Sequence, residues 1–174
     1  MAVTRLIFGD ETSPNLPYCR RYARAEGGQR APQARPLPGG PNGTLVAALT
    51  PNGWQAAMTG SGAGNGDVFA AYLEQVLGPT LVPGEVVGLA NLAAHKVAGL
   101  AELVAAHGAR LLYLPPSSPA VTPLELVFRK LKTWLRTAPA RTRDALEAVI
   151  GAAPGWISEQ EAQNWFNQCG YPVQ

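Results

Sequence analysis

The sequence lacks the features that mark membrane and secreted proteins. No apolar run reaches the roughly 18 residues that a membrane-spanning helix needs. A secretion signal needs an apolar stretch close to the N-terminus, where this sequence carries the charged residues Arg5 and Asp10. We therefore expect a cytoplasmic protein with no membrane partner.

Cysteine and charge are also scarce. The two cysteines, Cys19 and Cys169, lie far apart without paired spacing, which indicates free thiols rather than a disulfide framework or a zinc cluster. Charged residues make up only 15% of the chain and the net charge is +2, too small to indicate a nucleic-acid-binding protein by itself. The basic residues are nevertheless clustered: six of the 14 Lys and Arg lie between residues 129 and 143, and five more between residues 20 and 35.

What the sequence does contain is typical of one folded domain. Hydrophobic residues make up 47% of the 174 residues, enough to form a buried core. A chain of this length provides one domain of ordinary size and hardly two. We therefore expect residues 1–174 to form a single domain.

Hydrophobic periodicity and turn residues predict an α/β fold. Strands are predicted at residues 4–8, around 20–25, and at 44–49, 54–58, 85–89 and 110–114, and helices at residues 67–77, 95–107, 123–137, 142–152 and 158–169. The turn signal Pro51-Asn52-Gly53 predicts a hairpin between the strands on either side of it. The last two strands flank a helix, so they should lie parallel in one sheet.

Several residues are expected to fix the helices. Asp67 is placed to cap the helix that begins there, and Ser158 with Glu161 forms a capping-box sequence. His95 is expected to begin a helix. An apolar stripe predicts the buried side of helix 123–137, namely Leu124, Phe128, Leu131 and Leu135.

Few acidic residues are placed to carry chemistry. Only three are aspartates: Asp10, Asp67 and Asp144. Asp10 follows the first predicted strand and Glu125 opens the helix after the last one, so both could lie at one edge of the sheet. Two-metal phosphoryl chemistry needs several carboxylates from different elements converging on ions about 4 Å apart. The sequence offers two such carboxylates at this edge.

Several motifs resemble a known family. They are Asp10-Glu11-Thr12, Asn91-Leu92-Ala93-Ala94-His95-Lys96, and the stretch from Leu111 through Pro115-Pro116 and Ser118-Pro119 to Pro123-Leu124-Glu125. Further similarity at residues 21–25, 66–69 and 165–171 extends the match over nearly the whole chain. The sequence resembles the DDE domain of insertion-sequence transposases in the mariner superfamily, specifically the insertion sequence 630 family.

The resemblance implies an RNase H-like fold, a mixed sheet flanked by helices with additional C-terminal helices. It also implies that Asp, Asp and Glu bind two Mg²⁺ (or Mn²⁺) ions for DNA strand cleavage and transfer. Asp10 matches the first carboxylate and Glu125 the third, so both are the expected catalytic and metal-binding residues. The implied partner is double-stranded DNA, as transposon ends and target, and a homodimer is compatible with it. Nothing in the sequence resembles the helix-turn-helix region that precedes this domain in full transposases.

The second carboxylate of the family is missing. It should follow the strand at residues 85–89, where this sequence has Ala90. Alanine has no side-chain oxygen to offer Mg²⁺, which requires near-octahedral oxygen ligands. Glu85 should lie roughly 16 Å away on the opposite face of the strand, and Asp67 belongs to a different element. We therefore expect impaired catalysis and weakened metal binding at a degenerate site.

Other residues near this site also depart from the family. Ser117, Ala120 and Thr122 stand where family members usually carry Tyr, Asp and Asn. A single engineered change is therefore an incomplete explanation for Ala90. A decayed gene product and a repurposed, non-catalytic module that binds DNA or a protein partner remain alternatives.

The predicted DNA contacts and site residues have structural alternatives. The predicted DNA-binding residues are Lys96, Arg129, Lys130, Lys132 and Arg136. A row of basic side chains on one helix face would suit DNA phosphates, but a polar helix face exposed to solvent explains this row equally well. Glu125 is also the fourth residue of a possible capping box, Thr-Pro-Leu-Glu. A lone histidine such as His95 is more often structural than catalytic.

Overall fold

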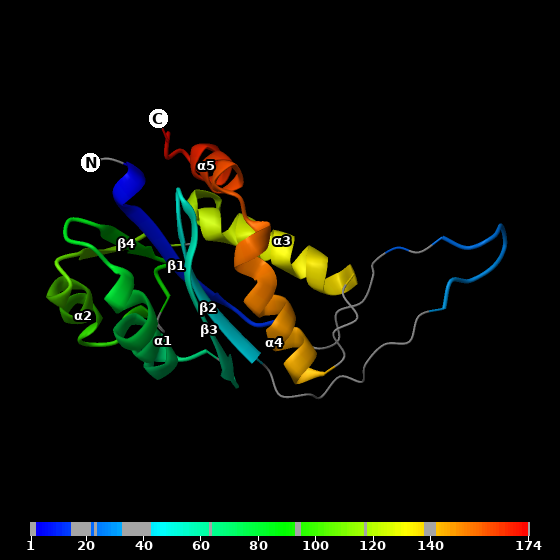
Figure 1. Cartoon of the computed structure of the whole chain (residues 1–174), viewed down its shortest axis with the longest axis horizontal. Coiled ribbons are helices and arrows are strands. Elements are labelled where there is room, and N and C mark those ends of the chain that lie inside the picture. Colours follow the sequence, from blue (N-terminus) through cyan, green and yellow to red (C-terminus); the bar gives the residue numbers. More distant parts are fainter. Residues whose placement is uncertain are drawn as a thin grey trace.

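The computed structural model shows a five-stranded mixed sheet at the centre of the molecule (Figure 1). The strands are β1 (Leu6–Thr12), β2 (Gly43–Thr50), β3 (Gly53–Ser61), β4 (Val86–Leu89) and β5 (Arg110–Tyr113), in the spatial order β3-β2-β1-β4-β5. β2 pairs antiparallel with β1 and β3, whereas β4 pairs parallel with β1 and β5. The predicted hairpin, the predicted parallel pair and the α/β class are confirmed.

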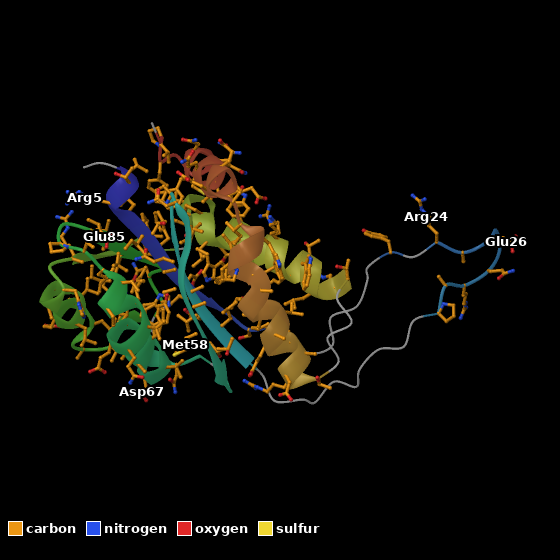
Figure 2. All side chains as sticks on the ribbon, in the orientation of Figure 1. Arg5, Arg24, Glu26, Met58, Asp67 and Glu85 are labelled. Atoms are coloured by element: carbon orange, nitrogen blue, oxygen red, sulfur yellow. The ribbon has the colours of Figure 1, made fainter. Side chains whose placement is uncertain are left out.

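The structure describes residues 3–14, 22, 24–32, 43–62, 64–92, 95–116, 118–137 and 142–173. The strand predicted around residues 20–25 therefore lies mostly outside the described residues, and so do Cys19, Arg20, Arg21 and Ser117. Cys169 is described and is a free thiol. Residues 24–32, with Arg24 and Glu26, extend away from the sheet (Figure 2).

Helices cover both faces of the sheet (Figure 1). One face carries α1 (Gly66–Tyr72), which continues as a π-helical turn over Leu73–Leu77, and α2 (Leu100–Ala106). The other carries α3 (Pro123–Thr137), α4 (Arg143–Ala152) and α5 (Glu159–Gln168). Short 3-10 turns lie at Val3–Arg5, Gly78–Thr80, Pro119–Val121 and Ala153–Trp156.

Alternation along the central strands produces two hydrophobic cores. Successive side chains of a strand point to opposite faces of the sheet. Leu6 and Phe8 of β1 therefore pack with α3, α4 and α5, while Ile7 between them packs with α1 and α2. The predicted stripe of α3 is buried in the first core. The result is a three-layer arrangement around one sheet.

The first strand is longer than predicted, and this changes the position of Asp10. β1 runs to Thr12, so Asp10 lies within the strand rather than after it. The extra residues are held by the antiparallel ladder with β2, in which Asp10 pairs with Ala47 and Thr12 with Leu45. The apolar run in the sequence ends at Phe8, yet the polar side chains of Asp10 and Thr12 are buried as well, so hydrophobicity alone placed the end of the strand too early.

One predicted helix start and one predicted helix cap are wrong. α2 begins at Leu100 rather than at His95. Gly99 precedes it with a φ of 89°, in the left-handed region, and His95 makes polar contacts with other segments instead. The side chain that caps α1 is Asn65 and not Asp67, because the Asn65 amide oxygen accepts a hydrogen bond from Val68 N–H at 2.9 Å.

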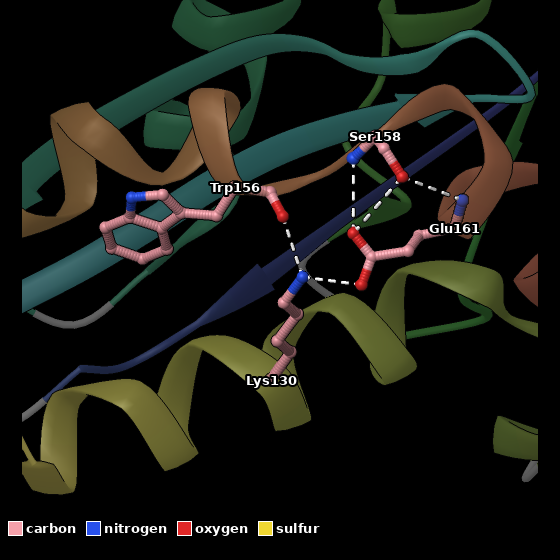
Figure 3. Close-up of polar contacts among 4 residues, drawn as sticks. All are labelled: Lys130, Trp156, Ser158 and Glu161. Carbon is pink, nitrogen blue, oxygen red and sulfur yellow. Dashed lines mark hydrogen bonds and ion pairs between the residues drawn. The ribbon is translucent and has the colours of Figure 1, made fainter.

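A cluster of polar contacts joins α5 to α3 (Figure 3). Lys130 donates hydrogen bonds to the Trp156 carbonyl at 2.7 Å and to Glu161 Oε1 at 2.6 Å. Glu161 is also half of the predicted capping box with Ser158, which is confirmed. The hydrogen bond from Lys130 lowers the pKa of Glu161. This single carboxylate therefore both starts α5 and ties it to α3.

We predict that Phe166→Ala destabilises the fold by about 3–5 kcal/mol, as expected for removing a fully buried aromatic side chain. Phe166 is 0% exposed and its ring lies 5.5 Å from that of Phe8 on β1. Urea unfolding followed by circular dichroism measures the change. The matched control Gln160→Ala changes an exposed position of the same helix and should stay within about 0.5 kcal/mol of the unmodified protein. Equal, small effects would show that α5 is not part of the core.

Candidate functional site

The parallel pairing of β1 with β4 places Asp10 and Ala90 next to each other. In this pairing Phe8 is opposite Gly88 and Gly9 is opposite Leu89. The next position of the register sets Asp10 beside Ala90, just past the end of β4. Asp10 and Ala90 each come two positions after Phe8 and Gly88, so their side chains point to the same face of the sheet as Phe8. This is the face that α3 covers. An acidic side chain in place of Ala90 would therefore share a face with Asp10.

These two positions and Glu125 line one pocket of about 250 Å³ at the carboxyl ends of β1 and β4. Its lining consists of Asp10, Glu11, Ala90, Asn91, Leu92, Leu114, Pro115, Ser118, Thr122 and Glu125. Asp10 comes from the sheet, and Glu125 comes from the first turn of α3. The structure thus brings together the predicted pair of carboxylates and the alanine between them. What this pocket binds stays a prediction at this point.

Asp10 is the buried carboxylate of the pocket. It is 7% exposed, and burial raises its pKa to about 7. The Glu11 N–H donates to Asp10 Oδ1 at 2.9 Å and opposes this rise, whereas the nearby charges of Glu11 and Glu125 add to it. A positive ion beside Asp10 would favour its ionised form. The electrostatics therefore suit a bound cation or a bound proton.

Sequence reasoning missed the contact between Glu11 and His95. Glu11 Oε2 contacts His95 Nε2, and His95 Nδ1 lies 2.7 Å from the carbonyl oxygen of Ala90. His95 is fully buried, with its ring 4.4 Å from the ring of Phe69. Burial alone would lower the pKa of His95, but the hydrogen bonds to Glu11 and to the Ala90 carbonyl outweigh it, so this pKa is raised.

Asn91 contributes an unsatisfied polar atom. Its side-chain oxygen is buried and accepts no hydrogen bond from the part of the chain that the structure describes. Asn91 also lines the pocket, directly after Ala90. Buried oxygens without a partner are uncommon and point to a ligand, an ion or a water. Asn91 is therefore a further candidate oxygen ligand, in addition to the carboxylates that the sequence singled out.

Glu85 and Asp67, both labelled in Figure 2, are not among the described residues that line the pocket, as predicted. Glu85 stands before β4, at the opposite end of that strand from Ala90, and accepts a hydrogen bond from Val82 N–H at 2.8 Å. Asp67 lies in the first turn of α1. Among the described residues that line the pocket, neither appears, so neither replaces the carboxylate missing at Ala90.

The predicted DNA-binding residues differ in how far they are committed to other contacts. Lys96 and Arg129 are exposed, whereas Lys132 and Arg136 are half-buried. Lys130 is engaged by Glu161 and the Trp156 carbonyl and lies over the ring of Trp165. These intramolecular contacts explain the position of Lys130 without DNA. A role in DNA binding stays a prediction for the whole set.

Comparison with known proteins identifies the family. Residues 5–147 match the family described as DDE superfamily endonuclease. The chain belongs to this family. No curated protein sequence gives a significant match.

Solved structures of the Mos1 transposase share the fold of this DDE domain. A pre-cleavage Mos1 transpososome gives a TM-score of 0.77 at 15% identity, covering 97% of this chain and 52% of the Mos1 chain. The Mos1 catalytic domain with raltegravir and Mg gives 0.65 at 10% identity, covering 97% and 81%. The predicted RNase H-like fold is therefore confirmed. The DDE domain spans about half the length of the Mos1 chain in the transpososome.

A membrane span would need a long apolar helix. Within the described ranges, every helix is too short or too polar to cross a bilayer. This finding agrees with the lack of a long apolar run in the sequence.

We predict that the metal-free DDE domain becomes less stable as the pH rises from about 4 to 7, between the unfolded and folded pKa values of Asp10. Asp10 keeps its proton up to about pH 7 in the folded state but releases it near pH 3.8 when unfolded, so folded molecules bind more protons in this interval. The raised pKa of His95 acts in the same direction, since its stabilising effect is lost as the pH rises through the folded value. Thermal unfolding in a chelator measures the slope.

The isosteric variant Asp10→Asn is the control for this slope, because it removes the ionising group and keeps the shape of the side chain. It should lose most of the decline between about pH 5 and 7. A slope that is unchanged in the variant would contradict the assignment to Asp10.

Proposed function

We propose that this DDE domain comes from a transposase of the insertion sequence 630 type and that Ala90 impairs its metal-dependent DNA cleavage. The observation that carries the proposal is the convergence of Asp10, Ala90 and Glu125 on one pocket at the carboxyl ends of two parallel strands. We further propose that residues 1–174 act as one domain and that its substrate is double-stranded DNA.

The donors in the pocket suit a hard divalent cation. Asp10, Glu125 and the unsatisfied oxygen of Asn91 are all oxygen donors, and Mg²⁺ and Mn²⁺ prefer such ligands. When bound, divalent ions of this kind polarise a phosphoryl oxygen and help to generate the attacking hydroxide. Ala90 removes one charged ligand from the set. We therefore propose that these residues hold Mg²⁺ or Mn²⁺ with weakened affinity.

The residues around the pocket have distinct proposed roles. Asp10 gives up its proton when the cation binds, because burial raises the pKa of the cation-free carboxyl to about 7 and a positive ion beside it favours the ionised form. Glu125, in the first turn of α3, would supply the second carboxylate of the cation site. Lys96 and Arg129 are exposed and can contact phosphates, so they would orient DNA rather than take part in the reaction.

We predict that Ala90→Asp raises Mg²⁺-dependent nicking of supercoiled DNA by at least about 10- to 100-fold, the range by which even indirect changes at metal sites alter affinity or activity. The new carboxylate would stand beside Asp10 in the parallel register. Gel assays of nicking at several Mg²⁺ concentrations measure the effect. The matched control Ala90→Asn has the same shape without the charge and should restore much less.

The double variant Asp10→Asn/Ala90→Asp tests whether the gain uses the proposed site. It should return to the background of the unmodified domain. Activity that persists in this double variant, or an Ala90→Asp variant that folds without gaining activity, would contradict the proposal that Ala90 is the principal lesion.

A non-catalytic DNA-binding module is the second candidate function. Ala90 favours it, because a domain without efficient cleavage could still bind DNA through its basic residues. Arg129 and Lys132 lie on α3 four and seven residues after Glu125, so they run from the pocket along the helix. Such a surface would bind duplex DNA without metal and with little sequence preference.

We predict that Arg129→Gln/Lys132→Gln weakens duplex binding and lowers the slope of log affinity against log salt by about 0.9 for each phosphate that the variant no longer neutralises. Fluorescence anisotropy at several salt concentrations measures this slope. Lys130→Gln is the matched comparison, and it should change the slope less because its ammonium group is already bonded to Glu161. Binding that does not depend on salt would exclude this function for the α3 surface.

A further inference from the structure

Two residues that line the pocket, Asp10 and Glu11, meet His95 in a combination of metal-binding side chains that the DDE pattern does not use. Suitable ligand atoms of Asp10, Glu11 and His95 all lie within 4.8 Å of one another. Asp10 and Glu11 are neighbours on β1, so their side chains leave the backbone toward opposite faces of the sheet. Their carboxylates can still approach each other, because β4 ends at Leu89 and leaves this edge of β1 open.

The hydrogen bonds of His95 determine which of its nitrogens could bind a metal. The carbonyl oxygen of Ala90 only accepts hydrogen bonds, so the nearby Nδ1, at 2.7 Å, must carry a hydrogen. In a neutral imidazole the other nitrogen, Nε2, then presents its lone pair to the Glu11 carboxylate. Two acceptors in contact need a positive species between them, either a second proton or a metal ion. Metal-binding histidines commonly donate their other N–H to a carbonyl in this way.

The surroundings hold His95 in this orientation. The side chain is fully buried against the ring of Phe69, and the Tyr113 hydroxyl donates to the His95 carbonyl at 2.6 Å. Glu11 is the adaptable partner, since its side chain is 20% exposed. Two ligands on one tetrahedral ion are about 3.4 Å apart at metal–ligand distances of about 2.0–2.2 Å. The Glu11 carboxylate must therefore swing outward to admit an ion, and its exposure allows this.

We propose that Asp10, Glu11 and His95 bind one transition-metal ion, with Zn²⁺ preferred over Mg²⁺, and that this binding needs no ligand at position 90. One imidazole nitrogen and two carboxylates suit Zn²⁺, which accepts nitrogen and oxygen ligands in a four-coordinate site. Mg²⁺ prefers an octahedron of oxygens and gains little from imidazole. The site leaves a coordination position for water or a phosphate oxygen.

This site differs from the proposed site between Asp10 and Glu125, although it shares Asp10 and although Glu11 also lines that pocket. The Asp10–Glu125 site faces α3, whereas His95 lies against Phe69 of α1, on the other side of the sheet. Because both sites use Asp10, ions at the two positions would compete. Zn²⁺ binding by the unmodified chain does not require that the domain cleave DNA, so this inference and the proposed function can fail independently.

Isothermal titration of the chelator-treated protein with Zn²⁺ and with Mg²⁺ tests the proposal. We expect one equivalent of Zn²⁺ to bind the unmodified chain more tightly than Mg²⁺ does. His95→Gln and Glu11→Gln should each weaken Zn²⁺ binding by at least about tenfold. The matched control Glu85→Gln removes a carboxylate at the far end of β4 and should leave the affinity unchanged within about twofold. Thermal melts of each variant identify any that fail to fold.

Co²⁺ as a spectroscopic substitute for Zn²⁺ gives a readout that does not depend on stability. Ligation through Nε2 of His95 should give a strongly shifted, exchangeable proton signal from its Nδ1–H in the NMR spectrum of the Co²⁺-loaded protein. This signal should be present in Glu85→Gln and absent in His95→Gln. The signal is measured in the unmodified protein, so the test remains valid even if His95→Gln loses affinity by misfolding.

Three results would overturn the proposal. The first is an absence of Zn²⁺ binding, which would mean that a proton lies between His95 and Glu11 and that the pair is an imidazolium–carboxylate bridge. The second is Zn²⁺ binding that is lost in Glu125→Gln but kept in His95→Gln, which would place the ion at the Asp10–Glu125 site. The third is equal affinity for Mg²⁺ and Zn²⁺ without the shifted proton signal.

Discussion

The parallel pairing of β1 with β4 is the constraint on which the site depends. It brings residues about 80 positions apart in the sequence into one register, so that the position after Leu89 lies beside Asp10. The same pairing ends before β1 does, because β1 is carried further by its antiparallel ladder with β2. The unpaired edge that results is where Glu11 meets His95. One feature of the sheet thus creates both the pocket and the open edge next to it.

Because Asp10 is buried, binding of a cation or a proton is favourable at this edge of the sheet. A buried carboxylate beside Glu11 and Glu125 is disfavoured in its charged form, and its raised pKa expresses that cost. A cation relieves the repulsion, and a proton relieves it when no cation is bound. A second aspartate in place of Ala90 would add another negative charge to the same face. The chain with Ala90 therefore tolerates the cation-free state better than a chain with three converging carboxylates would.

Local signals in the sequence were sufficient for much of the fold but not for the contacts of the site. The hairpin turn at Pro51-Asn52-Gly53 and the helix Pro123–Thr137 depend on neighbouring residues, and both were predicted correctly. The end of β1 and the start of α2 depend on partners elsewhere in the chain, so periodicity misplaced them. The Glu11–His95 contact joins residues 84 positions apart, so it is visible only in the three-dimensional structure. The family motifs contain both residues but do not say that they touch.

The basic residues of α3 show why a cluster of charge in the sequence overstates the charge available to a ligand. Lys130 and Arg129 are adjacent in sequence, yet Lys130 is bonded to Glu161 and the Trp156 carbonyl while Arg129 is exposed. Withdrawing Lys130 from its partners would leave Glu161 without its ion pair and would loosen α5 from α3. The same reasoning applies at the acidic edge, where Glu11 is already committed to His95. A ligand there must compete with an existing contact, which favours ions that bind imidazole as well as carboxylate over ions that bind carboxylate alone.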